Sequence, residues 1–232
     1  MLVFGASGAV GQAIVGASLA SGWATFGVSR RLPVASGSQG VRWVAYNPFA
    51  EPPQSLDIGE ARFDAVCWAQ GGNATDSIYD IDLDLHQNLY NANCLYVIKT
   101  LSELIRLDRL SSAGARLCVV SSIWQDVARS NKLSYTMTKA ALGGLVRSTA
   151  VDLGADGHLI NAVLPGVLDT PMTRANLKPE QLRRVEQSTL FDRLPDLQSV
   201  ATLVTFLCSN NNQSVTGQSV AVDLGFTYAH LL

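Results

Sequence analysis

The sequence predicts an α/β fold, a doubly wound Rossmann-like parallel sheet with helices on both faces. Three observations predict it. Short apolar runs recur along the chain, with longer helix-prone stretches between them. The run Leu117–Val120 is apolar at every position, as expected of a strand buried on both faces of a parallel sheet. A glycine-rich turn follows directly after the first run, Leu2–Phe4.

Each element follows from its own pattern. The strand-like runs, rich in β-branched residues, are Leu2–Phe4, Ala24–Val28, Val41–Tyr46, Ala65–Ala69, Leu117–Val120, Ile160–Leu164 and Ser219–Val222. The helix-like stretches are Val10–Ala20, Asp84–Leu107, Leu133–Leu153 and Leu197–Cys208. The polar, helix-prone segment 173–190 follows a Pro-Gly turn and is a candidate mobile lid. No linker interrupts the pattern, so we expect residues 1–232 to form one domain.

Composition narrows the class of protein. The 232 residues are 47% hydrophobic and 16% charged, which allows a sizeable core and excludes disorder as the main state. The net charge is -2, with no basic run and no acidic tail. This balance predicts no nucleic-acid partner and no membrane partner.

Cysteine and histidine placement argues against a metal site. The four cysteines contain no Cys-x-x-Cys pair, and the three histidines are scattered, so we expect no bound metal and reduced thiols in a cytoplasmic protein. Residues 1–29 carry no charge, but they lack the basic start of a signal peptide. Because the first expected strand begins at Leu2, we expect no targeting segment.

A glycine-rich loop links the first expected strand to the first helix, and it reads Gly5-Ala6-Ser7-Gly8-Ala9-Val10-Gly11. Glycines let the backbone turn sharply and approach a pyrophosphate closely. The helix N-terminus adds free N–H groups and the positive end of the helix dipole. This strand–turn–helix context predicts a dinucleotide site. The alternative is a turn that serves only the packing of strand against helix.

The end of the second expected strand indicates which dinucleotide binds. An acidic residue there would hydrogen-bond the adenosine ribose and select NAD. The chain has Ser29, Arg30 and Arg31 instead, and a guanidinium suits a 2′-phosphate. We therefore expect NADP(H), with Arg30 as the better candidate, because Arg31 fits a solvated turn equally well.

A serine, a tyrosine and a lysine form the candidate catalytic set. Ser122 follows the strand Leu117–Val120, and Tyr135 and Lys139 share one face of a helix. A free tyrosine has a pKa near 10, and a nearby ammonium lowers it. We expect Tyr135 to act as general acid/base and Ser122 to hydrogen-bond the same substrate oxygen. A Tyr-x-x-x-Lys pair alone is common on protein surfaces, so the combination with the glycine loop carries the interpretation.

These motifs together resemble the short-chain dehydrogenase/reductase family, in its single-domain form similar to the 3-oxoacyl carrier-protein reductases, over nearly the whole chain. The resemblance implies that Gly5, Gly8 and Gly11 form the cofactor loop and that Lys139 also holds the nicotinamide ribose. It further implies that Asn93 keeps a proton-relay water near Lys139, with Asn88 and Asn91 as nearby competitors.

The resemblance extends toward the C-terminus. Leu164–Pro171 resembles the family's Pro-Gly segment, in which Pro165, Gly166, Val167 and Thr170 would border the nicotinamide, with Val167 and Thr170 contacting its carboxamide. The segments 216–218 and 222–225 resemble a C-terminal signature that is usually followed by a subunit-contact strand.

Three departures from the family pattern stand out. The middle glycine of the loop lies at Gly8, where single-domain members usually have it one position later, at Ala9. The usual Asn-Asn-Ala-Gly reads Trp68-Ala69-Gln70-Gly71, and Ala69, Gln70 and Gly71 are still expected to line the adenosine side of the cofactor. Asn47 replaces an adenine-binding aspartate, and an amide accepts a hydrogen bond more weakly than a carboxylate.

The expected function is NADPH-dependent reduction of a ketone, whether 3-oxoacyl, sugar or another small carbonyl, to a secondary alcohol. The alternatives are an NAD(P)-linked alcohol or polyol dehydrogenase and a catalytically silent cofactor sensor on the same scaffold. Residues that could shape the substrate pocket are Asn73, Trp124, Gln125 and Asp126, and Trp124 is equally compatible with a packing role. By resemblance, the stretches Asp84–Leu107 and Leu133–Leu153 would pack across a two-fold axis into a homodimer or homotetramer.

Overall fold

Seven strands form one parallel sheet in the computed structural model, which describes residues 1–32, 40–170, 173–174 and 177–229. The strand order is β3-β2-β1-β4-β5-β6-β7, and every pairing is parallel. The bounds are β1 (Leu2–Phe4), β2 (Thr25–Ser29), β3 (Val41–Ala45), β4 (Ala65–Trp68), β5 (Arg116–Val120), β6 (Leu159–Pro165) and β7 (Ser219–Val222). The predicted fold class is confirmed, and each expected strand is displaced by at most one residue at either end.

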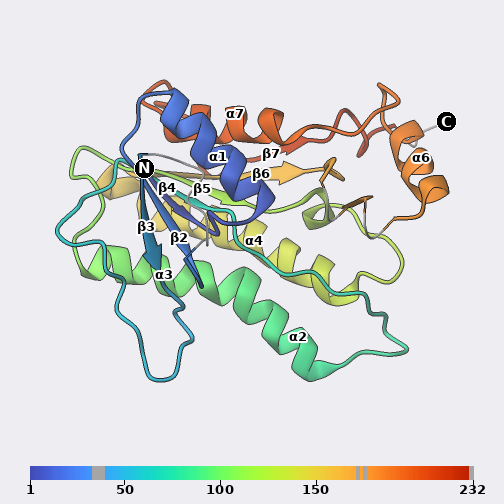
Figure 1. The fold of residues 1–232 in the computed structure, drawn as a ribbon, viewed down its shortest axis with the longest axis horizontal. Helices are drawn as coiled ribbons and strands as arrows, with labels where there is room; N and C mark the ends of the chain where they lie inside the picture. Colours follow the sequence, from blue (N-terminus) through green and yellow to red (C-terminus); the bar gives the residue numbers. More distant parts are fainter. Residues whose placement is uncertain (33–39, 171–172, 175–176, 230–232) are drawn as a thin grey trace.

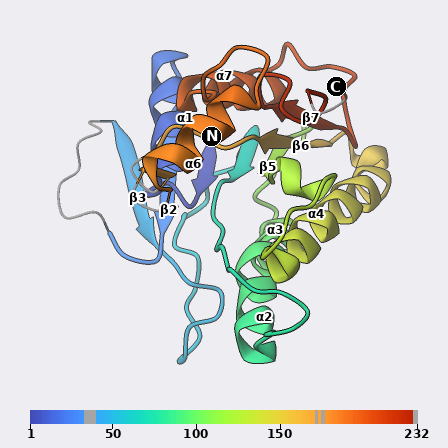
Figure 2. The same cartoon turned by 90° about the vertical axis from the view of Figure 1, so that its right-hand side faces the viewer.

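Helices cover both faces of this sheet (Figures 1 and 2). One face carries α1 (Ala9–Ala20) and α7 (Leu197–Cys208), and the other carries α3 (Tyr96–Arg106) and α4 (Leu133–Asp152). Side chains of a strand alternate between the two faces. Val3 therefore belongs to the apolar cluster under α1 and α7, whereas Phe4 belongs to the cluster under α3 and α4.

The strand order reverses next to β1, because β1 lies between β2 and β4. In open parallel sheets, ligands bind at such a switch point, outside the carboxyl ends of the strands. The backbone of Gln70, after β4, packs against Gly5, after β1: a Cβ on Gly5 would lie 2.6 Å from Gln70 Cα, and Gly5 has a φ of +73°. Only glycine fits there, so the two loops meet at the predicted cofactor edge.

The stretch predicted as one helix, Asp84–Leu107, is divided into three parts. It comprises α2 (Leu83–Tyr90), the π-helical turn η1 (Asn91–Leu95) and α3. The π-helical turn holds one extra residue and turns the Asn93 side chain inward, where it is 1% exposed. Such turns are often found at functional sites.

The segment 173–190 is helical over α6 (Pro179–Gln187), which buries none of its side chains. Figure 1 places α6 at the right-hand end of the molecule. Residues 175 and 176 lie outside the described residues, so the lid function of this segment stays a prediction. Among the described residues, no helix has both the length and the apolar character needed to cross a bilayer.

The contact between Gly5 and Gln70 leads to a stability prediction. Gly5→Ala forces a Cβ into the Gln70 backbone at positive φ, so we expect a loss of about 2 kcal/mol or more in the free energy of unfolding. Gly16→Ala, in α1 with no atom within 4 Å of the added Cβ, is the matched control and should stabilise by about 0.5 kcal/mol. Urea unfolding measures both. Equal stability of the two variants would contradict the close approach of these loops.

Candidate active site

The predicted catalytic residues come together where the chain leaves β5 beside the first half of α4. Ser122 follows β5 and begins the short helix η2 (Ile123–Gln125), where its Oγ accepts a hydrogen bond from Trp124 N at 3.3 Å. Tyr135 and Lys139 lie one turn apart in the first half of α4. The Ser122 side chain hydrogen-bonds that of Tyr135. The two hydroxyl groups can therefore contact the same oxygen atom of a substrate.

Lys139 is buried below this pair, with 4% of its surface exposed. Its Nζ donates to Val120 O at 3.3 Å and lies 5.6 Å from the centroid of the Tyr135 ring. Burial lowers the pKa of Lys139 to about 8, against a smaller opposing effect of the Cys94 thiol. The ammonium is therefore kept charged at neutral pH, but only by a small margin.

The pKa of Tyr135 changes in the direction opposite to the one expected. Burial raises the pKa of Tyr135 above its ordinary value of 10.0, and the Ser122 hydrogen bond opposes this rise without cancelling it. The expectation of a lowered Tyr135 pKa is therefore wrong for the protein by itself. The physical reason is that desolvation of the phenolate is the largest effect on this pKa.

Asn93 is the asparagine that the structure places beside Lys139. A Cβ on Gly71 would lie 3.1 Å from Asn93 Oδ1 and 3.7 Å from Lys139 Nζ, so both groups border Gly71. The Asn93 amide also accepts from Gly72 N at 2.7 Å and donates to Thr138 Oγ1 at 2.8 Å. The competitor Asn88 is exposed, and the other competitor, Asn91, accepts from Gln87 instead.

The glycine loop has the shape expected of a pyrophosphate cradle. Gly8 begins α1 without a side-chain cap, and the first turn, which includes Ala9 and Val10, contains no acidic residue. Gly11 packs so closely on the loop that a Cβ added at this position would lie 2.8 Å from Ala6 Cα. Ser7 is exposed, and its carbonyl accepts from Gln12. The open helix N-terminus therefore fits an anionic group.

The expected adenosine residues lie at the ends of β2, β3 and β4. Ser29 is buried and its Oγ donates to Arg31 O, whereas both Arg30 and Arg31 are exposed. The Arg30 charge lies near Tyr96, whose pKa it lowers against a larger rise caused by burial. Asn47 uses its Oδ1 to accept from Phe49 N at 3.1 Å, which leaves that amide less free for adenine than expected.

The loop after β4 holds an unpaired polar atom. Ala69 donates its N–H to Phe4 O, which fixes the loop against β1. The neighbouring Gln70 has a buried side-chain oxygen that accepts no hydrogen bond among the described residues. A buried acceptor without a partner destabilises the folded state. The unpaired Gln70 Oε1 therefore fits a ligand that donates a hydrogen bond between these loops.

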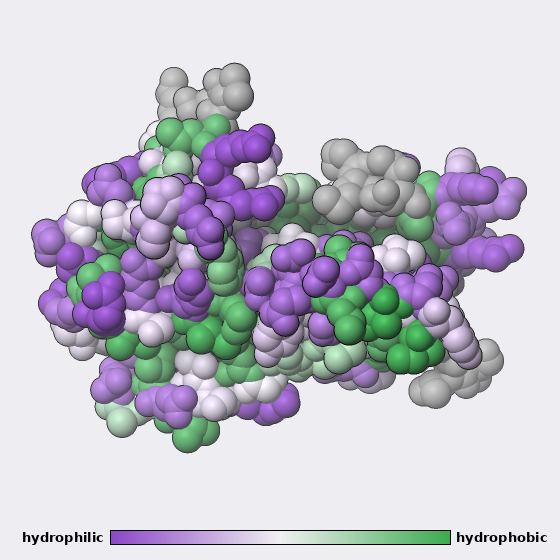
Figure 3. Space-filling model, turned by 90° about the horizontal axis from the view of Figure 1, so that it is seen from below, coloured by the Kyte–Doolittle hydropathy of each residue, from purple (hydrophilic) through white to green (hydrophobic). Residues whose placement is uncertain are grey.

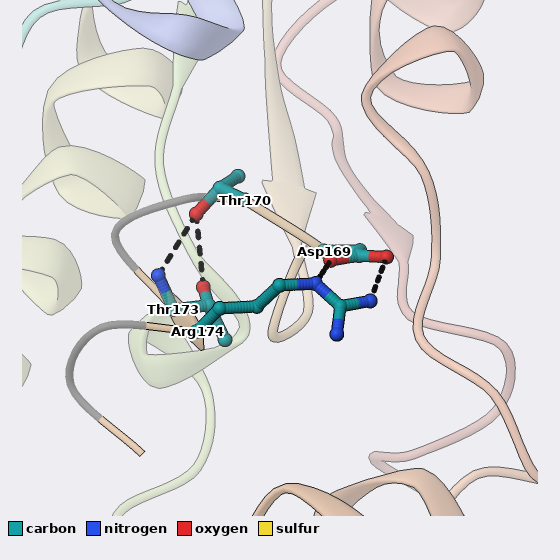
Figure 4. A network of polar contacts seen from close by, with 4 residues as sticks. All are labelled: Asp169, Thr170, Thr173 and Arg174. Atoms are coloured by element: carbon teal, nitrogen blue, oxygen red, sulfur yellow. Dashed lines mark hydrogen bonds and ion pairs between the residues drawn. The ribbon is translucent and has the colours of Figure 1, made fainter.

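The expected nicotinamide segment follows β6. Gly166 N donates to Val222 O at 2.9 Å, which fixes the chain after Pro165, and Val167 is half-buried. Thr170 Oγ1 accepts from Thr173 N at 3.1 Å and also pairs with Thr173 Oγ1 at 3.0 Å (Figure 4). In the same view, Arg174 forms a two-pronged ion pair with Asp169 at 2.6 and 2.7 Å. This pair is exposed, so we assign it little stabilising effect.

A buried network at the start of α4 was not predicted from the sequence. Ser134, directly before Tyr135, is fully buried; its N–H donates to Asp76 Oδ1 at 3.1 Å and its Oγ pairs with His86 Nδ1 at 2.8 Å. These contacts hold the first turn of α4, and hence Tyr135, against the loop after β4. The three residues are far apart in the sequence and form no local motif, so no sequence signal could have revealed them.

The residues expected to shape the substrate pocket divide into two groups. Trp124 packs edge-to-face on Phe226 with ring centroids 6.1 Å apart, which supports its packing role. Gln125 is buried, and its Nε2 donates hydrogen bonds to Ser219 Oγ and Asp126 Oδ1, so we assign it a role in holding the fold. Asn73 and Asp126 are exposed.

Known proteins resemble the chain in both sequence and fold. The family model described as enoyl-(acyl carrier protein) reductase matches residues 60–227. Glucose 1-dehydrogenase from Gluconobacter oxydans is 30% identical over 149 residues, which cover 64% of this chain and 56% of that relative. L-rhamnose 1-dehydrogenase (NAD(P)(+)) from Azotobacter vinelandii is 32% identical over 183 residues, which cover 73% of this chain and 71% of that relative.

The chain spans about half the length of several curated relatives that it matches, between 46% and 57%. Among solved structures, a short chain dehydrogenase family protein from Francisella tularensis superposes with a TM-score of 0.87 over 97% of both chains. Its sequence identity is 24%, so this likeness shows the shared fold.

Burial of Lys139 leads to a prediction about stability and pH. Between pH 8 and 10.5 the unfolded chain holds the lysine proton and the folded chain does not, so this group makes the folded state more stable as pH rises through that window. Lys139→Met removes the buried charge and should raise the free energy of unfolding at pH 7 by about 1 kcal/mol or more.

The advantage of Lys139→Met should shrink as pH rises toward 10, because the lysine of the unmodified protein is then neutral in the folded state. Urea unfolding at a series of pH values measures the difference. A variant that is less stable than the parent by the same amount at every pH would show that the lysine is not desolvated.

Proposed function

Because the chain belongs to the short-chain dehydrogenase/reductase family, we propose that it reduces a small ketone to a secondary alcohol with NADPH. The contact between Ser122 and Tyr135 above the buried Lys139 carries this proposal. In the proposed reaction, Tyr135 acts as general acid for reduction and as general base for the reverse reaction.

The raised pKa of Tyr135 suits the direction of reduction. A phenol whose pKa lies above 10.0 keeps its proton at neutral pH and can donate it to a carbonyl oxygen. Ser122 donates a second hydrogen bond to that oxygen and fixes its position. Lys139 stabilises the phenolate that remains after proton transfer, since its ammonium lies below the ring.

The bound NADPH would supply the hydride. Gly5 to Gly11 would hold its pyrophosphate, Gln70 would offer its unpaired oxygen near the adenosine side, and Lys139 and Asn93 would border the nicotinamide side. The absence of an acidic residue after β2 and the exposed guanidinium of Arg30 support NADP over NAD. The relative from Azotobacter vinelandii is named for both cofactors.

The relatives and the candidate site together support a class of substrate. Glucose and L-rhamnose dehydrogenases are named for hydroxyl-bearing small molecules, which supports chemistry at an alcohol or carbonyl carbon here. A 3-oxoacyl compound, a sugar or another small ketone would present the required oxygen to Ser122 and Tyr135. Oxidation of an alcohol or polyol is the same reaction in reverse and is the alternative direction.

An apolar outer face supports assembly into a homodimer or homotetramer. Ile98 and Ile105 on α3 are 47% and 46% exposed, and a groove of about 340 Å³ runs between α3 and α4, bordered by Ile98 and Leu145. In Figure 3, seen from below, apolar side chains interrupt the polar surface of this side of the molecule.

The cysteines support a cytoplasmic location. All four thiols are buried and none forms a disulfide, which suits a protein from a reducing compartment.

Replacement of the general acid tests the proposed function. Tyr135→Phe removes the transferable proton and should lower kcat for ketone reduction at least about a thousandfold, with NADPH affinity nearly unchanged. NADPH oxidation with a panel of ketones and acetoacetyl thioesters measures the rate, and fluorescence titration measures binding. Retained turnover would overturn the assignment of Tyr135.

Replacement of the arginine after β2 tests the cofactor choice. Arg30→Ala removes the guanidinium proposed to bind the 2′-phosphate and should weaken NADPH binding about tenfold or more while sparing NADH. Arg31→Ala is the matched control on the adjacent exposed residue and should change affinity less. Unchanged NADPH affinity in Arg30→Ala would contradict this account of selectivity.

Association through the outer face of α3 has a direct test. Sedimentation should show a species of at least twice the chain mass of 24.8 kDa. Ile98→Glu places a charge in the apolar face and should shift the protein toward the single-chain mass. A single species of 24.8 kDa in the unmodified protein would exclude the dimer.

A further inference from the structure

We infer that the substrate carries a carboxylate, which the Arg129 guanidinium binds beside the catalytic hydroxyls, with the fixed charge of Lys132 nearby. This inference rests on the proposed function and narrows its substrate class. The two cations belong to the loop that joins η2 to α4, between Ser122 and Tyr135 in the sequence.

Each of these cations lies over an aromatic ring of the candidate site. The Arg129 guanidinium is 5.8 Å from the centroid of the Trp124 ring, and Trp124 lies two residues after Ser122, to whose Oγ its N–H donates. Lys132 Nζ is 5.9 Å from the centroid of the Tyr135 ring. The loop thus presents two positive charges next to the residues that would contact the reacting carbonyl group.

Lys132 is held in place by neutral acceptors. Its Nζ donates to Asn73 Oδ1 and Ala74 O, both at 2.8 Å, and to Thr75 Oγ1 at 3.3 Å. Burial lowers the pKa of Lys132, the neighbouring Arg129 charge lowers it further, and Asp76 opposes both effects. The ammonium is therefore fixed in position beside a second cation.

Arg129 has no counter-ion among the described residues. It is exposed, and none of the ion pairs there includes Arg129 or Lys132. A guanidinium that lies on an aromatic ring still exposes its edge, whose N–H groups match a carboxylate in a two-pronged geometry. Arg129 thus has the free donors that an anionic substrate requires.

The acidic residues nearby do not neutralise Arg129. Asp76 is 3% exposed and accepts from Ser134 N, so its charge serves the start of α4 and partly balances Lys132. Asp126 is exposed, and its Oδ1 accepts from Gln125 Nε2 at 3.2 Å. The loop retains a positive charge that a substrate carboxylate would balance.

Matched pairs of substrates test this inference. NADPH oxidation is followed with pyruvate, acetoacetate and levulinate, each beside its methyl ester, which has the same ketone without the charge. These acids place the carboxylate at three distances from the carbonyl carbon. For the preferred spacing, kcat/KM for the acid should exceed that for its ester by about tenfold or more, because hydrogen bonds to charged groups are stronger.

Variants at the loop identify the residue responsible. Arg129→Gln should lower the acid-to-ester ratio about tenfold, mainly through KM, and Arg129→Lys should recover part of it. Arg42→Gln is the matched control: Arg42, on β3, also places its guanidinium over an aromatic ring, 5.1 Å from the Phe26 centroid, and its loss should leave the ratio unchanged.

The outcomes separate this inference from the proposed function. If all three pairs react at acid-to-ester ratios near one, or if Arg129→Gln leaves the ratio of the preferred pair unchanged, the carboxylate inference is wrong and the reductase proposal stands. If no ketone reacts, whether acid, ester or neutral compound, the proposed function fails and this inference fails with it.

Discussion

The buried ammonium of Lys139 is the constraint on which the candidate site depends. A charged group with 4% of its surface exposed destabilises the fold unless its surroundings are arranged for it, and here its pKa falls to about 8. The carbonyl of Val120 at the end of β5 accepts one of its protons. The positions of β5 and α4 are therefore tied to each other through the residue that supports Tyr135.

The rest of the site is arranged around that lysine by contacts between distant segments. The π-helical turn places the Asn93 amide between Gly72 and Thr138, so η1, α4 and the loop after β4 are joined at one residue. A second network, through Ser134 and its partners Asp76 and His86, fixes the first turn of α4. Together these contacts fix the Tyr135 phenol beside Ser122.

Much of this arrangement could be predicted from the sequence. The strands can be placed within one residue, because short apolar, β-branched runs recur between helix-prone stretches. The glycine loop and the Ser122, Tyr135 and Lys139 set could also be predicted, since their chemistry requires fixed residue types at fixed spacing.

Other features could not be predicted, because they depend on packing. The apolar periodicity of Asp84–Leu107 indicates a helix but does not reveal the extra residue of a π-helical turn, since the flanking turns keep the helical pattern. The direction of the Tyr135 pKa was predicted wrongly, because the spacing of Tyr135 and Lys139 shows their proximity but not their burial. Asp76, His86 and Ser134 meet only in the folded chain.

The measurement that tests the account most directly is the pKa of Tyr135 itself. Ultraviolet difference spectra between the unmodified protein and Tyr135→Phe, recorded over a pH series with and without NADP⁺, isolate the ionisation of this one phenol. We predict a pKa above 10.0 in the protein alone and a lower pKa once the cationic nicotinamide lies beside the phenol. An ordinary pKa in the protein alone, unchanged by NADP⁺, would contradict both the burial of the phenol and its place next to the cofactor.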